Sequence, residues 1–351
     1  MTRRLWLCAI LIITLIMAMP ALAARRRTVT PGDPDHCVHT TLARFFTSAQ
    51  NLAVDEQHVY VADDFGTIIR LPKLGGGIEL LVFSLGDWTP LSMTIDATNI
   101  YLGVMARNGF FTKEPGAILT VPKSGGVPTV LVENVRTPFA IAADATHIYW
   151  AAAGTIDFAA QRIESDGKVE RALKNGSSRQ TLAEDLSGPL GLAIDANTVF
   201  FSETGIADDD PTVGLYRIPK NGGTAAELAD EIGAILLAVD GNTVVFFGGN
   251  ETEGGIVAIE KDGATPMRVL YAGNETSDET AGGAIRIADR RAYFVLQRDG
   301  GDAGELAWVS IDAPNGLVVV REGLYFEDDF ALDGCAAIVS TIEGQLIRTG
   351  R

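Results

Sequence analysis

Short apolar runs separated by turn residues recur along the whole chain, and residues 116–150 contain one full unit of this pattern. The runs are rich in β-branched residues, which favour strands. The four runs are Ile118–Val121, Thr129–Val132, Phe139–Ala143 and Ile148–Trp150. The unit therefore predicts four short antiparallel strands, named c, d, a and b in this order. After residue 50 no pattern of helical periodicity continues beyond two turns, so the fold class is predicted to be all-β.

Each predicted strand a ends in an aspartate, and this anchor residue recurs at spacings of 41 to 51 residues. The seven anchors are Asp55, Asp96, Asp144, Asp195, Asp240, Asp289 and Asp333. A repeat of 40–50 residues indicates a propeller or a solenoid. Seven anchors predict a seven-bladed β-propeller of four-stranded antiparallel blades. We interpret the anchors as structural, because a short carboxylate at a turn can accept hydrogen bonds from the turn backbone.

The two ends of the repeat region predict how the ring closes. After Asp333 the chain has room for strands a, b and c, ending in Gln345–Arg348, but not for a strand d. Before Asp55, Thr40–Phe46 resembles a strand d that has no blade of its own. Closure removes exposed sheet edges. We therefore expect the N-terminal strand to complete the last blade.

The N-terminus has the pattern of a secretory signal peptide. Arg3 and Arg4 precede an apolar core, and Ala21-Leu22-Ala23 is a small-x-small cleavage site. The expected organisation is a signal peptide at residues 1–23, an N-terminal extension at 24–36 and the propeller at 37–351. An uncleaved membrane anchor is the alternative. The mature protein is expected in the periplasm or outside the cell.

Cysteine usage fits export. Cys8 leaves with the signal peptide, so the mature chain keeps Cys37 and Cys335. Cys335 lies in an a–b turn and Cys37 just before a strand d, positions that share one face of a propeller. Because exported proteins favour disulfides, we predict a Cys37–Cys335 bond across the closure. Two free thiols are the alternative.

The chain is strongly acidic, with a formal net charge of −17. Loss of two arginines with the signal peptide leaves 26 basic and 45 acidic residues, a net charge of −19. Such a surface repels nucleic acid and anionic membranes and attracts cations or basic partners. We expect no membrane segment after cleavage, and a monomer.

Three short motifs repeat in the blades: A-(V/I)-D at the end of strand a, (I/V)-Y-(W/V) in strand b, and P-K-x-G-G after strand c, as in Val121–Gly126. The combination resembles uncharacterised bacterial exported β-propeller proteins and, more distantly, the YWTD and NHL propellers. The resemblance covers nearly the whole mature chain. It implies the fold, whereas propellers serve as enzymes, receptors and scaffolds alike.

Two charged residues interrupt strand a. Counted back from the anchors, Arg286 occupies a slot that holds Leu, Met or Ile in blades 1 to 5. Asp329 occupies a slot that holds small, polar or aliphatic residues in the other blades, including Asn51 and Ser92. Both slots lie at the channel mouth in adjacent blades. We expect Arg286 and Asp329 to pair across the blade interface, either as a structural pair or to orient a ligand. The four residues are candidate ligand-binding residues.

Carboxylates concentrate in the b–c loops of the same face. The candidates are Asp63, Asp64, Glu203, Asp208, Asp209 and Asp210. Converging oxygen ligands suit Ca²⁺, and a carboxylate ring attracts cationic groups. No Asp-x-Asp-x-Asp-Gly loop is present, so a calcium site would need several blades, and no other cofactor is indicated. A solvated acidic surface is the alternative interpretation.

No catalytic residue is predicted. The few histidines fit no Ser-His-Asp or zinc spacing, and no G-x-S-x-G, H-E-x-x-H or P-loop motif is present. The favoured function is a non-enzymatic exported propeller that binds a protein or glycan through an acidic mouth. The alternative is a Ca²⁺-dependent hydrolase or lyase with carboxylates at the funnel. Two or three converging carboxylates with shifted pKa values would distinguish the enzyme from the binding protein.

Overall fold

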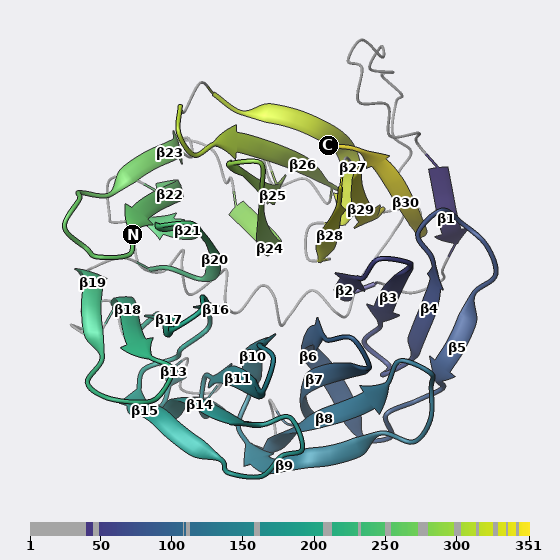
Figure 1. Cartoon of the computed structure of the whole chain (residues 1–351), viewed down its shortest axis with the longest axis horizontal. Helices are drawn as coiled ribbons and strands as arrows, with labels where there is room; N and C mark the ends of the chain where they lie inside the picture. The colour runs from purple at the N-terminus through teal and green to yellow at the C-terminus, as the bar shows by residue number, and fades with distance from the viewer. Residues whose placement is uncertain are drawn as a thin grey trace.

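The computed structural model is a seven-bladed β-propeller of four-stranded antiparallel blades (Figure 1). It describes residues 40–44, 49–107, 109, 113–157, 162–205, 213–230, 233–249, 254–272, 280–297, 303–313, 316–325, 329–334, 336–341 and 344–351. The expected signal peptide and extension, and both Cys37 and Cys335, lie outside these residues. The described residues contain no helix long and apolar enough to span a membrane.

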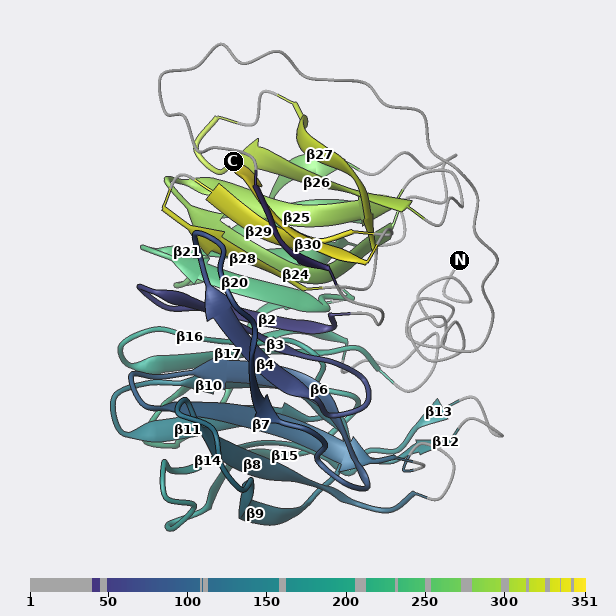
Figure 2. The same ribbon diagram turned by 90° about the vertical axis from the view of Figure 1, so that its right-hand side faces the viewer.

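Strand order in each blade runs from the axis outward as a, b, c and d. Blade 1 consists of β2 (Asn51–Val54), β3 (His58–Ala62), β4 (Ile68–Pro72) and β5 (Glu79–Val82), and blade 2 of β6 (Trp88–Ile95), β7 (Asn99–Ala106), β8 (Gly116–Pro122) and β9 (Thr129–Val135). Blade 3 consists of β10 (Pro138–Ala143), β11 (His147–Ala152), β14 (Gly167–Leu173) and β15 (Gln180–Leu186). Blade 4 consists of β16 (Leu192–Ile194), β17 (Thr198–Glu203), β18 (Gly214–Pro219) and β19 (Ala226–Asp230). In blade 3 the short hairpin of β12 (Ile156–Asp157) and β13 (Arg162–Ile163) projects from one face of the ring (Figure 2).

Blades 5 and 6 follow the same order. They consist of β20 (Leu236–Asp240), β21 (Thr243–Gly249), β22 (Gly254–Glu260) and β23 (Arg268–Ala272), and of β24 (Thr280–Ala288), β25 (Arg291–Gln297), β26 (Ala303–Ser310) and β27 (Val318–Tyr325). Blade 7 has strands a to c from the C-terminal end of the chain: β28 (Phe330–Asp333), β29 (Ala336–Ser340) and β30 (Gln345–Gly350). Its strand d is β1 (Thr40–Arg44), which pairs antiparallel with β30. The predicted closure by an N-terminal strand is therefore confirmed.

Alternation along strand a explains how the blades stack. Val54 and Leu52, one and three residues before the first anchor, pack against Ala331 and Ile338 of the preceding blade. Positions two and four before the anchor face the following blade instead, because side chains alternate along a strand. Large residues on one face thus meet small residues on the next, which lets the facing blades pack closely.

The anchor aspartates organise the turns as predicted. Asp55 Oδ1 accepts hydrogen bonds from the backbone N–H groups of Gln57 at 2.9 Å and His58 at 2.8 Å. Its Oδ2 accepts from the Tyr60 hydroxyl at 2.9 Å and from Lys123 Nζ, in the c–d turn of blade 2, at 2.7 Å. The tyrosine of strand b and the lysine of P-K-x-G-G are therefore partners of the aspartate.

These ion pairs form a closed ring on one face of the propeller, each linking the anchor of one blade to a cation of the next. The seven pairs are Asp55–Lys123, Asp96–Lys174, Asp144–Lys220, Asp195–Lys261, Asp240–Arg290, Asp289–Arg351 and Asp333–Lys73. Their N–O distances lie between 2.6 and 3.1 Å. The ring therefore joins every blade to its neighbour, including the last to the first.

Blade 6 departs from the sequence-based alignment by one residue. Ala288 pairs with Arg291, so Ala288 occupies the position of the other anchors and Asp289 lies in the turn. Asp289 and Arg290 both have left-handed backbones, with φ of 50° and 55°, as a two-residue hairpin turn requires. In this turn the Asp289 side chain is 71% exposed. The expected slot of Arg286 is thus corrected to the one that holds Ala53 in blade 1.

Candidate functional site

Arg286 and Asp329 form the expected pair between blades 6 and 7. Arg286 Nη2 donates to Asp329 Oδ1 at 2.8 Å and to Oδ2 at 2.9 Å. Arg286 lies on the innermost strand β24, in the slot that faces the next blade, and Asp329 immediately precedes the innermost strand β28. The corrected register explains the contact, because a residue two positions before the anchor position points toward the following blade.

Asp329 also connects blade 7 to blade 1. Its Oδ2 accepts a hydrogen bond from the Leu52 N–H at 3.3 Å, and its own N–H donates to the Gln50 carbonyl at 3.4 Å. The side chain is 14% exposed. Burial raises the pKa of Asp329, and Arg286 and the N–H groups of Phe330 and Leu52 oppose that rise. The carboxylate thus contacts the innermost strands of three consecutive blades at the seam.

Arg286 retains hydrogen-bonding capacity in this arrangement. Besides Asp329, the guanidinium donates from Nη1 to the Ile285 carbonyl at 3.4 Å. Within the described part of the chain its Nε makes no hydrogen bond. The side chain is 39% exposed. Because Asp329 holds the Arg286 guanidinium from one side, the other N–H donors of Arg286 point in a fixed direction.

Asn51 and Ser92 occupy the Asp329 slot in blades 1 and 2, and both are buried. The Ser92 hydroxyl donates to the Pro138 carbonyl of blade 3 at 2.8 Å, so it joins two blades. Asn51 is 5% exposed, and its Nδ2 has no hydrogen-bond partner among the described residues. Ser92 therefore makes a structural contact. Asn51 instead places a buried Nδ2 donor beside Leu52, whose backbone N–H donates to Asp329.

The described rim carboxylates have structural partners. Asp63 accepts hydrogen bonds from the N–H groups of Phe65 and Thr67 in its own turn, and buried Glu203 accepts from the Ser187 N–H at 3.0 Å. Asp64 also has an interaction partner. Asp208, Asp209 and Asp210 lie outside the described residues. In the part of the chain that is described, no three His, Cys, Asp or Glu side chains gather to hold a metal ion.

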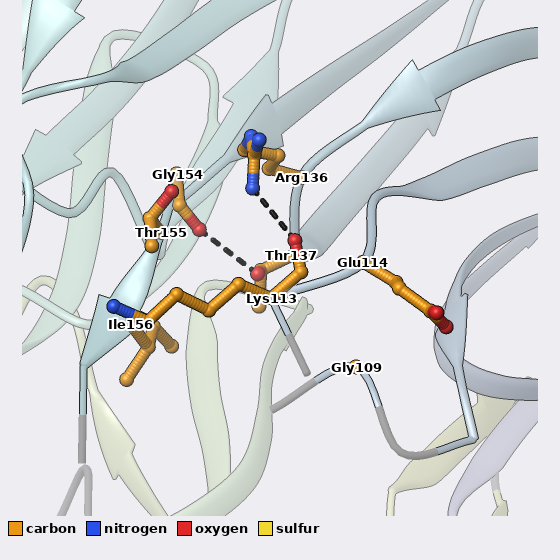
Figure 3. Close-up of a pocket in the computed structure, with 8 residues that line it drawn as sticks. All are labelled: Gly109, Lys113, Glu114, Arg136, Thr137, Gly154, Thr155 and Ile156. Carbon is orange, nitrogen blue, oxygen red and sulfur yellow. Dashed lines mark hydrogen bonds between the residues drawn. The ribbon is translucent and has the colours of Figure 1, made fainter. Parts of the chain in front are cut away.

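The loops of blades 2 and 3 bring basic and acidic groups together around a small hollow (Figure 3). Lys113 Nζ donates to Asp157 at 2.8 Å, and Arg136 Nη1 donates to the Lys113 carbonyl at 2.8 Å. Asp166 accepts from the N–H and the hydroxyl of Thr155. These contacts fix the loops to each other, so the acids here balance local cations instead of lining an acidic cup.

A larger cavity of about 520 Å³ lies at the seam on the face of the ion-pair ring. It is lined by Glu56, Gln57, Pro72, Lys73, Leu74, Asp333, Gly334 and Arg348. At other joints a glycine of the c–d turn rests on the outer strand of the preceding blade: a Cβ on Gly176 would lie 2.4 Å from the Leu131 carbonyl oxygen. The equivalent Gly75 has nothing within 4 Å. The c–d turn of blade 1 therefore lacks this close contact with the preceding blade.

The lysine and tyrosine partners of the anchors were not recognised from the sequence, although the signal is present in it. Each P-K-x-G-G lysine lies in the c–d turn of the blade that directly follows the blade of its aspartate. In the sequence the recurring lysine has the position of a turn residue, and its partner lies in another blade, so the repeat by itself predicts only the turn.

Fold and site define the chain as a closed seven-bladed β-propeller, and comparisons with known proteins agree on the fold. No protein-family model matches the chain, and no curated protein matches its sequence. The crystal structure of the computationally designed Ika8 protein is similar, with a TM-score of 0.56, 14% identity, and coverage of 89% of this chain and 98% of that one. A structure of YCF48 bound to D1 peptide has a TM-score of 0.56 and 10% identity, covering 90% and 96%.

Proposed function

We propose that the protein is an exported, non-enzymatic scaffold that binds a protein or glycan partner through the mouth face of the propeller. The observation that carries the proposal is the Arg286–Asp329 pair. A charged pair replaces uncharged residues on two inner strands, and the arginine keeps part of its surface and some donors available. Arginine is enriched where interfaces bind tightly, because its planar fork fixes both position and direction.

The rest of the described site supports binding more than catalysis. The rim carboxylates Asp63 and Glu203 are held by backbone N–H groups, and the buried Asp329 is neutralised by Arg286. A ring whose blades are joined by seven ion pairs is rigid. Its surface can therefore have the shape that fits the partner before the partner binds. A protein partner is the specific expectation, because the similar propeller YCF48 was solved with a bound peptide.

The test uses the mature protein as bait for a displayed library of random peptides, with a glycan array as the second arm. The variant Arg286→Ala/Asp329→Asn removes the pair without leaving a buried lone charge. Lys168→Ala, which removes an exposed ion pair to Glu184 on blade 3, is the matched control.

We expect peptides that bind wild type and the control but lose at least about tenfold in affinity for the double variant. Glycan binding with the same dependence would identify a glycan partner. Binding that is unchanged in the double variant would contradict the mouth as the binding site. A metal requirement would appear as a rise in melting temperature when millimolar Ca²⁺ follows EDTA, and would favour the hydrolase or lyase alternative.

A further inference from the structure

The outer edge of the first blade is unusually apolar. Seven of the ten exposed large hydrophobic side chains in the described part of the chain belong to blades 1 and 2: Phe65, Leu74, Ile78, Leu80, Phe83, Val127 and Val130. Four of them, Leu74, Ile78, Leu80 and Phe83, follow one another along the c–d turn and outer strand β5. Exposed patches of this kind mark interaction surfaces on soluble proteins.

The repeat itself shows that these residues are exceptional. By strand register, the position of Phe83 is occupied in the other blades by Glu133, Glu184, Asp230, Ala272, Glu322 and Arg44. Charges there protect an outer edge strand from pairing with other strands. Phe83 is 82% exposed. The position of Leu74 is likewise polar elsewhere, with Ser124, Asn175, Asn221, Asp262 and Asp312.

We propose that β5 is the surface through which two copies of this chain associate. β5 is the last strand of its sheet, so one edge of its backbone has no strand partner within the described residues. Two β5 strands related by a two-fold axis would pair antiparallel and extend both blades into one sheet. Leu81 is the extra residue of a β-bulge in β5. With the axis at Leu80, Leu80 lies opposite Leu80 of the partner subunit, and Ile78 lies opposite Phe83 of the partner subunit.

Charge favours a second copy at this place. The chain carries a net charge of −17, so two copies repel each other wherever acids face acids. The segment from Leu74 to Phe83 has one acid, Glu79, and Arg70 Nε neutralises it at 2.7 Å. In the proposed register Glu79 lies opposite Val82 of the partner subunit, so the two carboxylates do not meet. The segment is thus uncharged overall and complementary to itself.

This association departs from the monomer that the sequence alone leads us to expect, and sedimentation velocity tests it. The mature protein is measured from about 1 µM to about 100 µM. We expect a concentration-dependent dimer. Phe83→Glu, which copies blades 2, 3 and 6, should weaken dimerisation at least about tenfold and leave the fold intact. The control Val319→Glu places the same charge on exposed outer-strand β27 and should change nothing.

A rescue variant tests the register. Ile78→Lys/Phe83→Glu would place a lysine opposite a glutamate at both ends of the paired strands, so it should regain most of the dimer that each single substitution loses. A wild-type protein that stays monomeric throughout the range would overturn the proposal. So would a dimer that Phe83→Glu leaves unchanged, or a double variant that dimerises no better than the single ones.

Discussion

Lys73 and Asp333 lie 260 positions apart in the sequence, yet Lys73 Nζ donates to Asp333 Oδ1 at 2.6 Å across the seam between the first and last blades. At the interior joints the continuous chain itself keeps neighbouring blades together. At the seam, the described residues supply non-covalent contacts: this pair, the β1–β30 strand pairing, the Asp329 hydrogen bonds to blade 1, and the packing of Leu52 and Val54 against Ala331 and Ile338. The seam is therefore the joint where one ion pair matters most.

The first prediction concerns opening of the ring. Lys73→Met removes the seam pair, and Lys123→Met removes the same interaction between blades 1 and 2. Each should cost about 1–2 kcal/mol, since the remaining Asp55 keeps its turn hydrogen bonds and the remaining Asp333 keeps its contact with Arg348. Only Lys73→Met should speed hydrogen exchange in β1 and β30, because opening at the seam exposes the closing strand. Equal exchange in the two variants would contradict a weak seam.

A second prediction separates the partly buried anchor Asp144 from Asp289, which lies exposed in its turn. Asp144 accepts from two backbone N–H groups, the Tyr149 hydroxyl and Lys220, whose side chain is 9% exposed. Asp144→Asn should destabilise by about 1–3 kcal/mol, because one amide oxygen cannot replace both Oδ1, which accepts from the backbone N–H groups, and Oδ2, which accepts from Tyr149 and Lys220. Asp289→Asn, at an exposed site, should cost less than about 0.5 kcal/mol. Urea unfolding of both variants measures the difference.

The pH dependence of stability follows from the same aspartates. Burial opposes their ionisation, but hydrogen bonds from lysine, backbone N–H groups and tyrosine outweigh it and hold the pKa of Asp55, Asp96 and Asp144 well below the ordinary range. An unfolded aspartate has a pKa of about 3.9. The unfolded state therefore binds more protons below that pH, and stability falls as pH decreases.

The urea midpoint should accordingly stay level between about pH 7 and pH 5 and drop steadily below about pH 4. Lys123→Met should reduce the drop, because it removes the partner that lowers the pKa of Asp55 most. A midpoint that rises on acidification would contradict the assignment. The tyrosine partner is affected in the opposite direction: burial and Asp55 raise the pKa of Tyr60 to about 12.

The sequence predicted the repeat, the blade number and the closure, because each depends on local patterns that recur seven times. It placed Arg286 one slot away from its position, because in blade 6 the aspartate of the A-D signature lies one residue after the anchor position, in the turn. The pair with Asp329 forms nevertheless, since the true slot is the one that faces blade 7. The ion-pair ring depends on contacts between blades, which a repeat aligned only within itself does not reveal.

The Cys37–Cys335 bond remains a prediction, and mass measurement tests it. The intact mature protein should be about 2 Da lighter than the same protein after reduction, once the mass added by alkylation is subtracted. Reduction should lower stability by about 2–5 kcal/mol, because the bond closes a loop of nearly the whole chain. Its neighbours Asp333 and Gly334 line the seam cavity, so the bond would reinforce the weakest joint. Free thiols in the native protein would refute it.

The last prediction compares two turn glycines that differ only in what lies beneath them. Gly75 and Gly176 hold the same P-K-x-G or L-K-x-G position with φ of 87° and 83°, so alanine is strained equally at both, by about 1 kcal/mol. A Cβ on Gly176 would also lie 2.4 Å from the Leu131 carbonyl oxygen, whereas one on Gly75 meets nothing within 4 Å. Gly176→Ala should therefore cost at least about 1 kcal/mol more than Gly75→Ala in urea unfolding, because the turn must move off blade 2 to admit the methyl group. Equal costs would contradict this difference in close contact between the two turns.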